Sequence, residues 1–111
     1  MRILFVCTGN SCRSPMAELY FGELCRRAGR SDLVAGSAGT FAGDGGTLSR
    51  GAAAVMRDLG IDGGGFRSRR LTPALAAEAD LIVAMTASHR ADLLAVAPEA
   101  AGKVRLLLDF D

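Results

Sequence analysis

The chain begins with a short run of apolar residues, 3–6, that ends on Cys7 and is followed at once by polar and turn-forming residues. An unbroken apolar run of this length predicts a strand that is buried on both faces. A helix is expected next, because Ser14-Pro15 places a proline in a first helical turn and Gly29 ends the pattern. The apolar face of this helix is predicted to consist of Met16, Leu19, Tyr20 and Leu24.

The rest of the chain alternates between the same two patterns. We predict strands at 33–35, 80–85 and 104–108, and helices at 48–59, 74–79 and 88–96. The helix at 48–59 is closed by Gly60. Its predicted apolar face consists of Ala52, Val55, Met56 and Leu59.

Strands that read as continuous apolar runs and alternate with helices are typical of a parallel sheet covered on both faces. We therefore predict a three-layer α/β fold, with the 111 residues forming one domain. In such sheets ligands bind beyond the carboxyl ends of the strands, and the first strand is usually central. Cys7 lies at that end of the first strand.

Composition and charge exclude several classes of protein. Lys and Arg number 13 against 12 Asp and Glu, and the net charge of +1 indicates no surface for nucleic acid. Three cysteines in a chain with no signal peptide favour free thiols in a reducing compartment, so we expect a cytoplasmic protein. No apolar run reaches about 18 residues, so no membrane span is expected.

The segment between the first strand and the first helix has the residues of an anion site. Cys7 and Arg13 have the spacing C-x5-R, and the backbone N–H groups of 8–13 can all turn inward around one oxyanion. Gly9 and Asn10 permit this curl, because they adopt positive φ at low cost. The positive end of the following helix adds to the attraction for an anion.

These residues also supply chemistry for a phosphoryl group. The helix dipole and Arg13 favour a thiolate on Cys7, and a thiolate is the form of cysteine that attacks. The guanidinium of Arg13 matches two phosphoryl oxygens, which a lysine could not bind bidentately. A buried cysteine at a strand end is often inert. The combination of cysteine, curl, arginine and helix start nevertheless favours a nucleophile that forms a thiophosphate intermediate.

Residues 6–18, VCTGNSCRSPMAE, resemble the signature of the low-molecular-weight protein tyrosine phosphatase family. Further similarities are the segments 37–40, 60–61, 69–72 and 79–85, so the resemblance covers essentially the whole chain. It implies a four-stranded parallel sheet of order 2-1-3-4 and a cysteine-dependent phosphatase acting on phosphorylated proteins. It implies neither a cofactor nor a metal.

The resemblance also implies roles for individual residues. Cys7 would be the nucleophile and Arg13 the phosphate clamp, while Asn10 would adopt a left-handed conformation. Ser14 would donate to the thiolate, although it could also be a plain helix cap. Ser37 would tether Asn10, although it could be a turn serine. The implied phosphate-binding residues are Thr8, Gly9, Asn10, Ser11, Cys12, Arg13 and Ser14, and Cys12 could trap an oxidised nucleophile as a disulfide.

Two features depart from the family pattern. Phe66 stands where a histidine that supports the loop is common in the family. The family's general acid is an aspartate in an Asp-Pro-aromatic motif beyond the last strand, and no such motif is present. Asp109 and Asp111 resemble the aspartate that follows the fourth strand, so the general acid is left unassigned. We therefore expect a C-terminally truncated domain that lacks the family's acid loop and last helix.

Several other side chains have plainer interpretations. His89, which has no partner at metal-ligand spacing, is expected to lie on the surface, and Cys25 is expected in the core. The arginines of 67–70 are expected to form a solvated loop. Phe41 is a candidate for an apolar wall beside the substrate, although loop aromatics are more often packed.

The substrate is left open between alternatives. Phosphotyrosine is the family default, but Ser11 stands where tyrosine-directed relatives usually carry an apolar residue and a protein arginine phosphatase branch carries threonine. A phosphate-binding protein that turns over poorly is a third possibility. An arsenate reductase is disfavoured, because the segment 85–92 holds no cysteine that could relay electrons.

Overall fold

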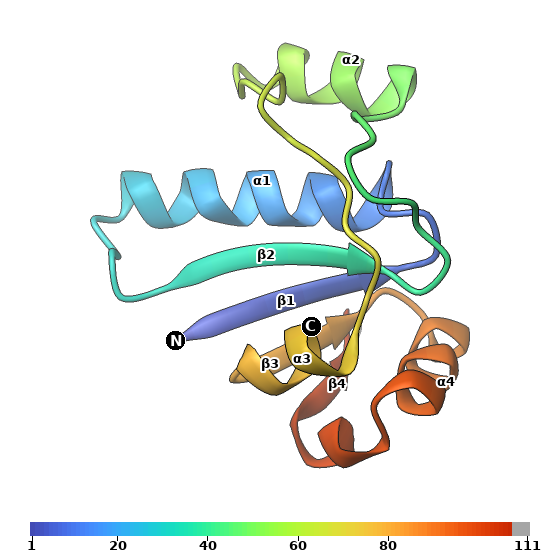
Figure 1. The fold of residues 1–111 in the computed structure, drawn as a ribbon. Helices are drawn as coiled ribbons and strands as arrows, with labels where there is room; N and C mark the ends of the chain where they lie inside the picture. The colour runs from blue at the N-terminus through green and yellow to red at the C-terminus, as the bar shows by residue number, and fades with distance from the viewer. Residues whose placement is uncertain (108–111) are drawn as a thin grey trace.

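The computed structural model describes residues 1–107. Four parallel strands form one sheet in the order β2-β1-β3-β4 (Figure 1), which confirms the predicted fold class and strand order. The strands are β1 (Arg2–Cys7), β2 (Val34–Gly39), β3 (Leu81–Ala84) and β4 (Val104–Leu106). The central β1 ends at Cys7, beside the end of β2 at Gly39.

The helices follow the predicted alternation. They are α1 (Arg13–Arg27), α2 (Arg50–Asp58), α3 (Pro73–Glu78) and α4 (Ala87–Val96), with a 3-10 helix, η1 (Pro98–Lys103), before β4. Gly60 has a φ of 72° just beyond α2, as expected of a glycine that closes a helix. Strand β2 extends to Gly39, well past the predicted 33–35. Residues 36–39 are small and have little strand propensity of their own, but each of them pairs with a residue of β1.

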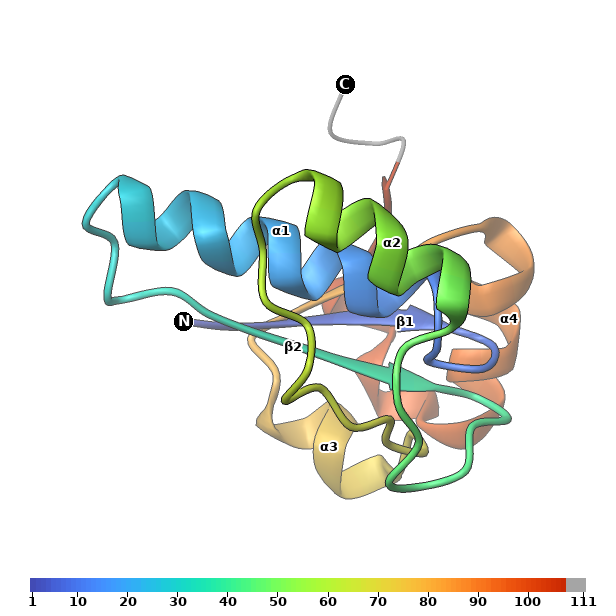
Figure 2. The same ribbon diagram turned by 90° about the horizontal axis from the view of Figure 1, so that it is seen from above.

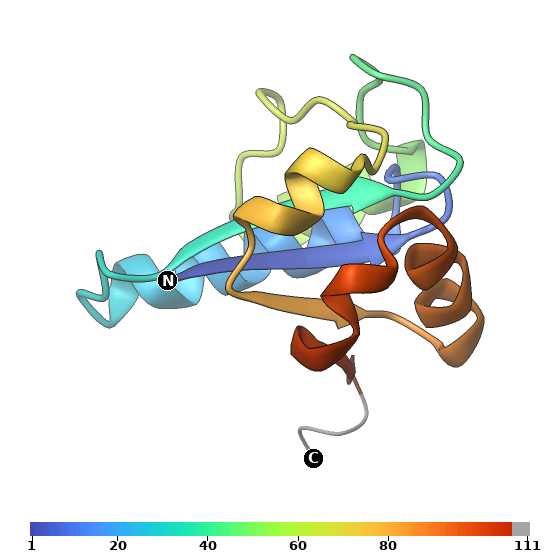
Figure 3. The same ribbon diagram turned by 60° about the horizontal axis from the view of Figure 1, so that its bottom comes forward.

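Alternate residues of the central strands face opposite layers, as a strand's period of two requires. Ile3, Phe5 and Val83 pack against α1, whereas Leu4 and Ile82 belong to the core on the other face. That second core includes residues of α3 and α4. Figure 1 shows these layers, with α2 packed on α1 and with α3 and α4 across the sheet. Figure 2 views the molecule from the side of α1 and α2, and Figure 3 turns the side of α3 and α4 toward the viewer.

The predicted apolar face of α1 is half right, since Met16 and Leu19 are half-buried. Tyr20 and Leu24 are 46% and 43% exposed, whereas Ala17 and Phe21 pack against the sheet. Phe21 meets Phe5 edge to face, with ring centroids 5.9 Å apart. The rotation of the helix follows from its first turn, where a buried Ser14 faces Cys7 and sets the stripe that continues through Ala17 and Phe21.

The predicted face of α2 is half right. Ala52 and Met56 are buried, but Val55 and Leu59 remain 45% and 46% exposed. The helix begins after Ser49, whose hydroxyl accepts a hydrogen bond from the N–H of Ala52. Because α2 packs on α1 and not on the sheet, it buries a narrower stripe than a helix between sheet and solvent. Cys25 is buried on α1, as expected.

Candidate active site

Residues 8–13, which we call the phosphate loop, connect β1 to α1 and leave their donors free. Within residues 1–107, no backbone N–H group of 8–14 donates to a protein acceptor. Helix α1 starts after Cys12 without a side-chain cap. Unpaired N–H groups in a tight curl at a helix N-terminus form an anion site.

Asn10 holds the curl of the phosphate loop in place. It has a φ of 50°, in the left-handed region, and its side chain is completely buried. Its Oδ1 accepts from the backbone N–H of Arg69 at 2.8 Å. Its Nδ2 donates to Ser14 Oγ and to Ser37 Oγ, each at 2.9 Å. One side chain therefore ties the loop to α1, to β2 and to the segment before α3.

The partners at the two ends of this network determine the direction of its hydrogen bonds. The N–H of Arg69 can only donate, so the amide oxygen of Asn10 faces it and the amide nitrogen faces the two serines. The hydroxyl of Ser37 donates to the carboxylate of Glu18 at 2.6 Å, and its oxygen accepts from Asn10.

The remaining proton in the chain belongs to Ser14. Its oxygen accepts from Asn10, so its single O–H is left to point at Cys7 Sγ, 2.8 Å away. Ser14 is completely buried and lies inside α1, so it is not the helix cap that was the alternative. A hydroxyl that donates to sulfur stabilises the thiolate over the thiol.

Glu18 belongs to this network, although no role was predicted for it from the sequence. Burial raises the pKa of Glu18, whereas the hydrogen bond from Ser37 and the charge of Arg69 act in the opposite direction. Its position one helical turn after Ser14 was a usable signal, because residues four apart on a helix share a face. A glutamate on the buried face of α1 needs a polar partner, and Ser37 is that partner.

Gly39 is a second residue whose function emerges only from the structure. A Cβ on Gly39 would overlap the carbonyl oxygen of Thr8 and lie 2.9 Å from the backbone nitrogen of Asn10. The phosphate loop therefore packs directly on the end of β2. Two further backbone bonds hold it there, from Thr40 N–H to Cys7 O at 2.9 Å and from Phe41 N–H to Thr8 O at 3.0 Å.

The outer part of the phosphate loop is held by a hydrogen bond from Ser49, the N-cap residue of α2. The N–H of Ser49 donates to the carbonyl oxygen of Ser11 at 2.8 Å, which orients that peptide group outward. Arg13 is exposed, and its guanidinium makes no hydrogen bond or ion pair with a residue of 1–107. Cys7 is buried, Cys12 is exposed, and both are free thiols. An exposed arginine and a set of unpaired N–H donors thus lie on the segment that directly follows the buried sulfur.

The expectation that His89 lies on the surface is wrong. The ring is 3% exposed, and its Nε2 lies 3.0 Å from Thr8 Oγ1. The arginines of 67–70 are exposed, as expected, but Arg69 is also tied to β2, since its Nε donates to the carbonyl oxygen of Ser37 at 3.2 Å. The contacts of His89 with Thr8 and of Arg69 with Ser37 join segments that are far apart in the chain, so no local sequence pattern predicts them.

The two phenylalanines near the site have opposite surroundings. Phe41 is 70% exposed, and its backbone contacts Thr8, so its ring is available beside the phosphate loop. Phe66, at the place of the histidine common in the family, is 7% exposed and packs as an apolar residue. Phe66 therefore offers the loop no hydrogen bond from its side chain, and Asn10 is held from the same segment by the backbone N–H of Arg69.

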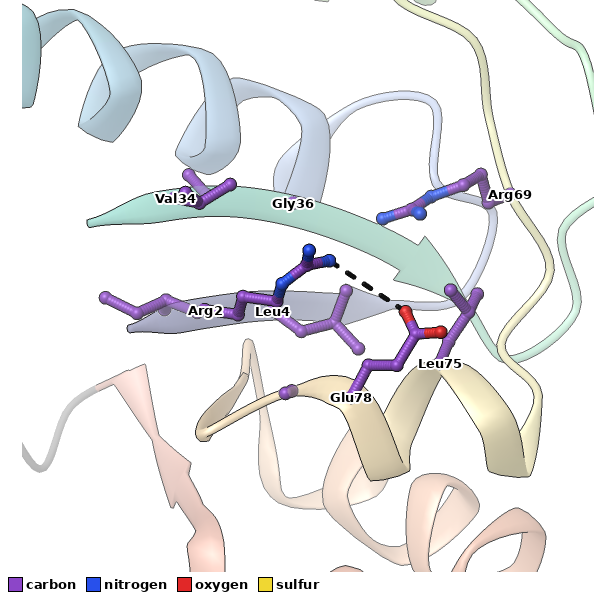
Figure 4. A pocket seen from close by; sticks show the side chains of 10 residues that line it. Arg2, Leu4, Val34, Gly36, Arg69, Leu75 and Glu78 are labelled. Atoms are coloured by element: carbon purple, nitrogen blue, oxygen red, sulfur yellow. Dashed lines mark ion pairs between the residues drawn. The ribbon is translucent and has the colours of Figure 1, made fainter. Parts of the chain in front are cut away.

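A separate groove lies on the α3 face of the sheet (Figure 4). It has a volume of about 190 Å³, and Arg2 and Glu78 face each other across it at 4.0 Å. Its lining includes Arg69 and Gly36 but no residue of the phosphate loop. The groove is therefore distinct from the anion site.

Residues 1–107 contain no group of three or more His, Cys, Asp or Glu side chains placed to hold a metal ion. No helix in that part is long and apolar enough to span a bilayer. Asp109 and Asp111, which resemble a family aspartate, lie outside the described residues.

The parallel sheet, the C-x5-R loop and the buried sulfur define a cysteine-dependent phosphatase. The sequence profile of the family described as "Low molecular weight phosphotyrosine protein phosphatase" matches residues 2–111, and the chain belongs to that family. A relative from Streptomyces coelicolor, a low molecular weight protein-tyrosine-phosphatase, is 38% identical over 99% of this chain and 69% of its own length. A protein-arginine-phosphatase from Bacillus subtilis is 42% identical over 81% of this chain and 59% of its own length.

Solved structures show the same pair of activities among similar proteins. A low molecular weight protein tyrosine phosphatase from T. tengcongensis has a TM-score of 0.92 and 42% identity, over 99% of this chain and 75% of that one. The YwlE arginine phosphatase, solved as a mutant with a phosphorylated active-site serine, has a TM-score of 0.93 and 35% identity. That similarity covers 99% of this chain and 71% of the other.

Proposed function

We propose that this protein hydrolyses phosphotyrosine in proteins through a thiophosphate intermediate on Cys7. The N–H groups of the phosphate loop and the guanidinium of Arg13 bind the three non-bridging oxygens of the phosphoryl group. The hydroxyl of Ser14 donates a hydrogen bond to Cys7 Sγ and orients the sulfur for attack. No cofactor enters the proposed reaction.

The reaction has two balanced steps. In the first, Cys7 Sγ attacks phosphorus, the S–P bond forms, and the P–O bond to the tyrosine breaks, so that the phenolate leaves and takes up a proton. In the second, water attacks the thiophosphate, the S–P bond breaks, and inorganic phosphate departs. The Cys7 thiolate is regenerated, and Arg13 neutralises charge on the transferring group in both steps.

The observation that carries this proposal is the curl of unpaired N–H groups around a sulfur that accepts a hydrogen bond from Ser14. Isothermal titration with phosphate and a steady-state assay test it on two variants. Cys7→Ser should bind phosphate and lose turnover. Arg13→Lys should lose both, because an ammonium cannot form the bidentate pair. Turnover by Cys7→Ser at the wild-type rate would contradict the assignment of the nucleophile.

Phosphoarginine is a second candidate substrate, supported by Ser11 and Phe41. The Ser11 hydroxyl gives the loop a small polar surface, and the exposed ring of Phe41 could stack on a planar guanidinium. The similarity to proteins that are named arginine phosphatases supports the same alternative. Both substrates are modified side chains of a phosphorylated protein.

We also propose that the protein works in the cytoplasm. Cys7, Cys12 and Cys25 are all free thiols, and a thiolate nucleophile requires a reducing compartment. Fractionation of the native host, followed by immunodetection, tests this placement. Recovery in an oxidising compartment would contradict it.

A further inference from the structure

His89 joins α4 to the first residue of the phosphate loop. Its Nε2 lies 3.0 Å from Thr8 Oγ1, and its Nδ1 lies 3.0 Å from Thr86 Oγ1. Thr86 is the N-cap of α4, and its hydroxyl also accepts from the backbone N–H of His89. The ring is therefore held at both nitrogens, between a helix start and the loop that follows Cys7.

The charge on the ring decides what the Thr8 hydroxyl can do. A neutral imidazole has one N–H, so one of the two threonine hydroxyls must donate to its bare nitrogen. A protonated ring donates from both nitrogens, so both threonine oxygens then accept. In the tautomer whose N–H is on Nδ1, the Thr8 hydroxyl is the donor to Nε2, so protonation of Nε2 releases the O–H of Thr8 to donate to an anion in the phosphate loop.

The charges around the ring link it to the anion site. Burial lowers the pKa of His89, the positive charge of Arg13 on α1 lowers it further, and Asp92 on α4 acts in the opposite direction. No charged group of β3, β4 or η1 within residues 1–107 contributes to this shift, although these elements pack near α4. The thiol of Cys7 on β1 is the other titratable group next to Thr8.

We propose that His89 is a positioning residue that couples proton uptake to anion binding at the phosphate loop. An anion in the loop offsets the charge of Arg13, so the ring takes a proton from solvent as the anion binds. The protonated ring then holds the Thr8 oxygen and turns the Thr8 O–H toward the anion. By linkage, a dianion binds more tightly as the pH falls through the titration of His89. This inference rests on the proposed phosphate site.

The chain offers a clean measurement, because His89 is its only histidine. NMR titration of the imidazole signals of the 111-residue chain, with and without sulfate at constant ionic strength, reports the ring directly. Sulfate is suitable because it remains a dianion throughout the titration. The Cys7→Ser variant removes the thiolate as a second titrating group. We expect sulfate to raise the midpoint of the histidine titration by about one pH unit.

Calorimetry on variants tests the reciprocal effect. Sulfate should bind about tenfold more tightly at about pH 5 than at about pH 8 in the Cys7→Ser background. Adding His89→Gln, whose amide can still contact Thr8, should keep binding at the higher pH and reduce the pH effect to less than about twofold. Arg90→Gln is the matched control, since it removes an exposed charge beside His89 and should leave the coupling intact.

The outcomes separate this inference from the proposed function. If sulfate binds and the histidine titration does not move, the coupling is refuted while the phosphate site stands. If sulfate does not bind at all, both fail. A pH effect that persists in the His89→Gln variant would also refute the role of His89.

Discussion

At the scale of single residues, the reactivity of Cys7 depends on a hydrogen-bond chain that begins at a carboxylate. Glu18, Ser37, Asn10 and Ser14 are linked in that order, and each bond has one possible direction once the N–H of Arg69 has oriented the Asn10 amide. At the end of this chain, the hydroxyl of Ser14 donates a hydrogen bond to the sulfur of Cys7. A polar network of this kind is stable in the interior because every member is paired.

Removing the last donor in this chain should impair chemistry more than binding. A hydrogen bond to a charged group is worth about 1.5–3 kcal/mol, so Ser14→Ala should lower kcat about 10- to 100-fold. KM should change little, because the N–H groups that bind phosphate remain. Alkylation of Cys7 by iodoacetamide at about pH 6 should slow in parallel.

Ser31→Ala, an exposed serine remote from the site, is the control for the Ser14 variant. Equal alkylation rates in Ser14→Ala and wild type would show that the hydroxyl does not stabilise the thiolate.

Ser11 is expected to influence the choice between the two candidate substrates. Ser11→Ile should favour phosphotyrosine, because it narrows the loop and makes its surface apolar, and Ser11→Thr should favour phosphoarginine. The ratio of kcat/KM on phosphotyrosine and phosphoarginine peptides measures this effect. A change of less than about threefold, about 0.7 kcal/mol, would mean that Ser11 does not select the substrate.

At the scale of elements, the site is where α1 and β2 meet the end of β1. The rotation of α1 brings Ser14 to Cys7 and Glu18 to Ser37 on β2. The same rotation leaves Tyr20 in solvent, although its position fits an apolar stripe. The packing of this helix therefore follows its polar contacts as much as its apolar residues.

The close approach of the phosphate loop to β2 makes Gly39 sensitive to substitution. Gly39→Ala should lower the free energy of unfolding by about 1–3 kcal/mol, because its Cβ would overlap Thr8 and force the loop away. Phosphate affinity should fall with it. Urea denaturation and calorimetry measure the two effects.

Gly22→Ala is the matched control on α1. A Cβ there meets no atom within 4 Å, and alanine is the better helix former by about 1 kcal/mol, so this variant should be more stable than wild type. A Gly39→Ala variant that behaves like Gly22→Ala would contradict the packing argument.

The contact between α1 and β2 should also make stability depend on pH through Glu18. Burial raises the pKa of Glu18 above its usual 4.5, so the folded state binds more protons than the unfolded state between the two values. Stability contributed by this group is therefore present at low pH and is lost as the pH rises through that window.

Glu18→Gln removes this titration and still offers Ser37 an acceptor oxygen. Chemical denaturation at several values between about pH 4 and about pH 7 should show the variant gaining on wild type as the pH rises. If the free energies of unfolding of Glu18→Gln and wild type differ by the same amount at every pH, the raised pKa of Glu18 does not contribute to stability.

At the scale of the whole molecule, the alternation of elements was predictable and the side-chain contacts between them were not. The sheet, its order and the position of Cys7 at the carboxyl end of β1 follow from strand patterns and from the resemblance. Half of the predicted face of α1 was wrong, because the spacing of apolar residues does not show that a serine in the first turn is buried. His89 was misplaced for a related reason, since its partner Thr8 lies 81 residues away.

The sequence by itself determined the chemistry and its local frame: a cysteine, a curl of residues that tolerate positive φ, an arginine and a helix start, all within residues 7–15. Such features are local, because they depend on backbone preferences and spacing over one or two turns of chain. Only the tertiary structure decided which distant groups hold that frame, namely Glu18, Gly39, Arg69 and His89. Their roles depend on packing between layers, where a close approach or a buried hydrogen bond is possible only after the chain has folded.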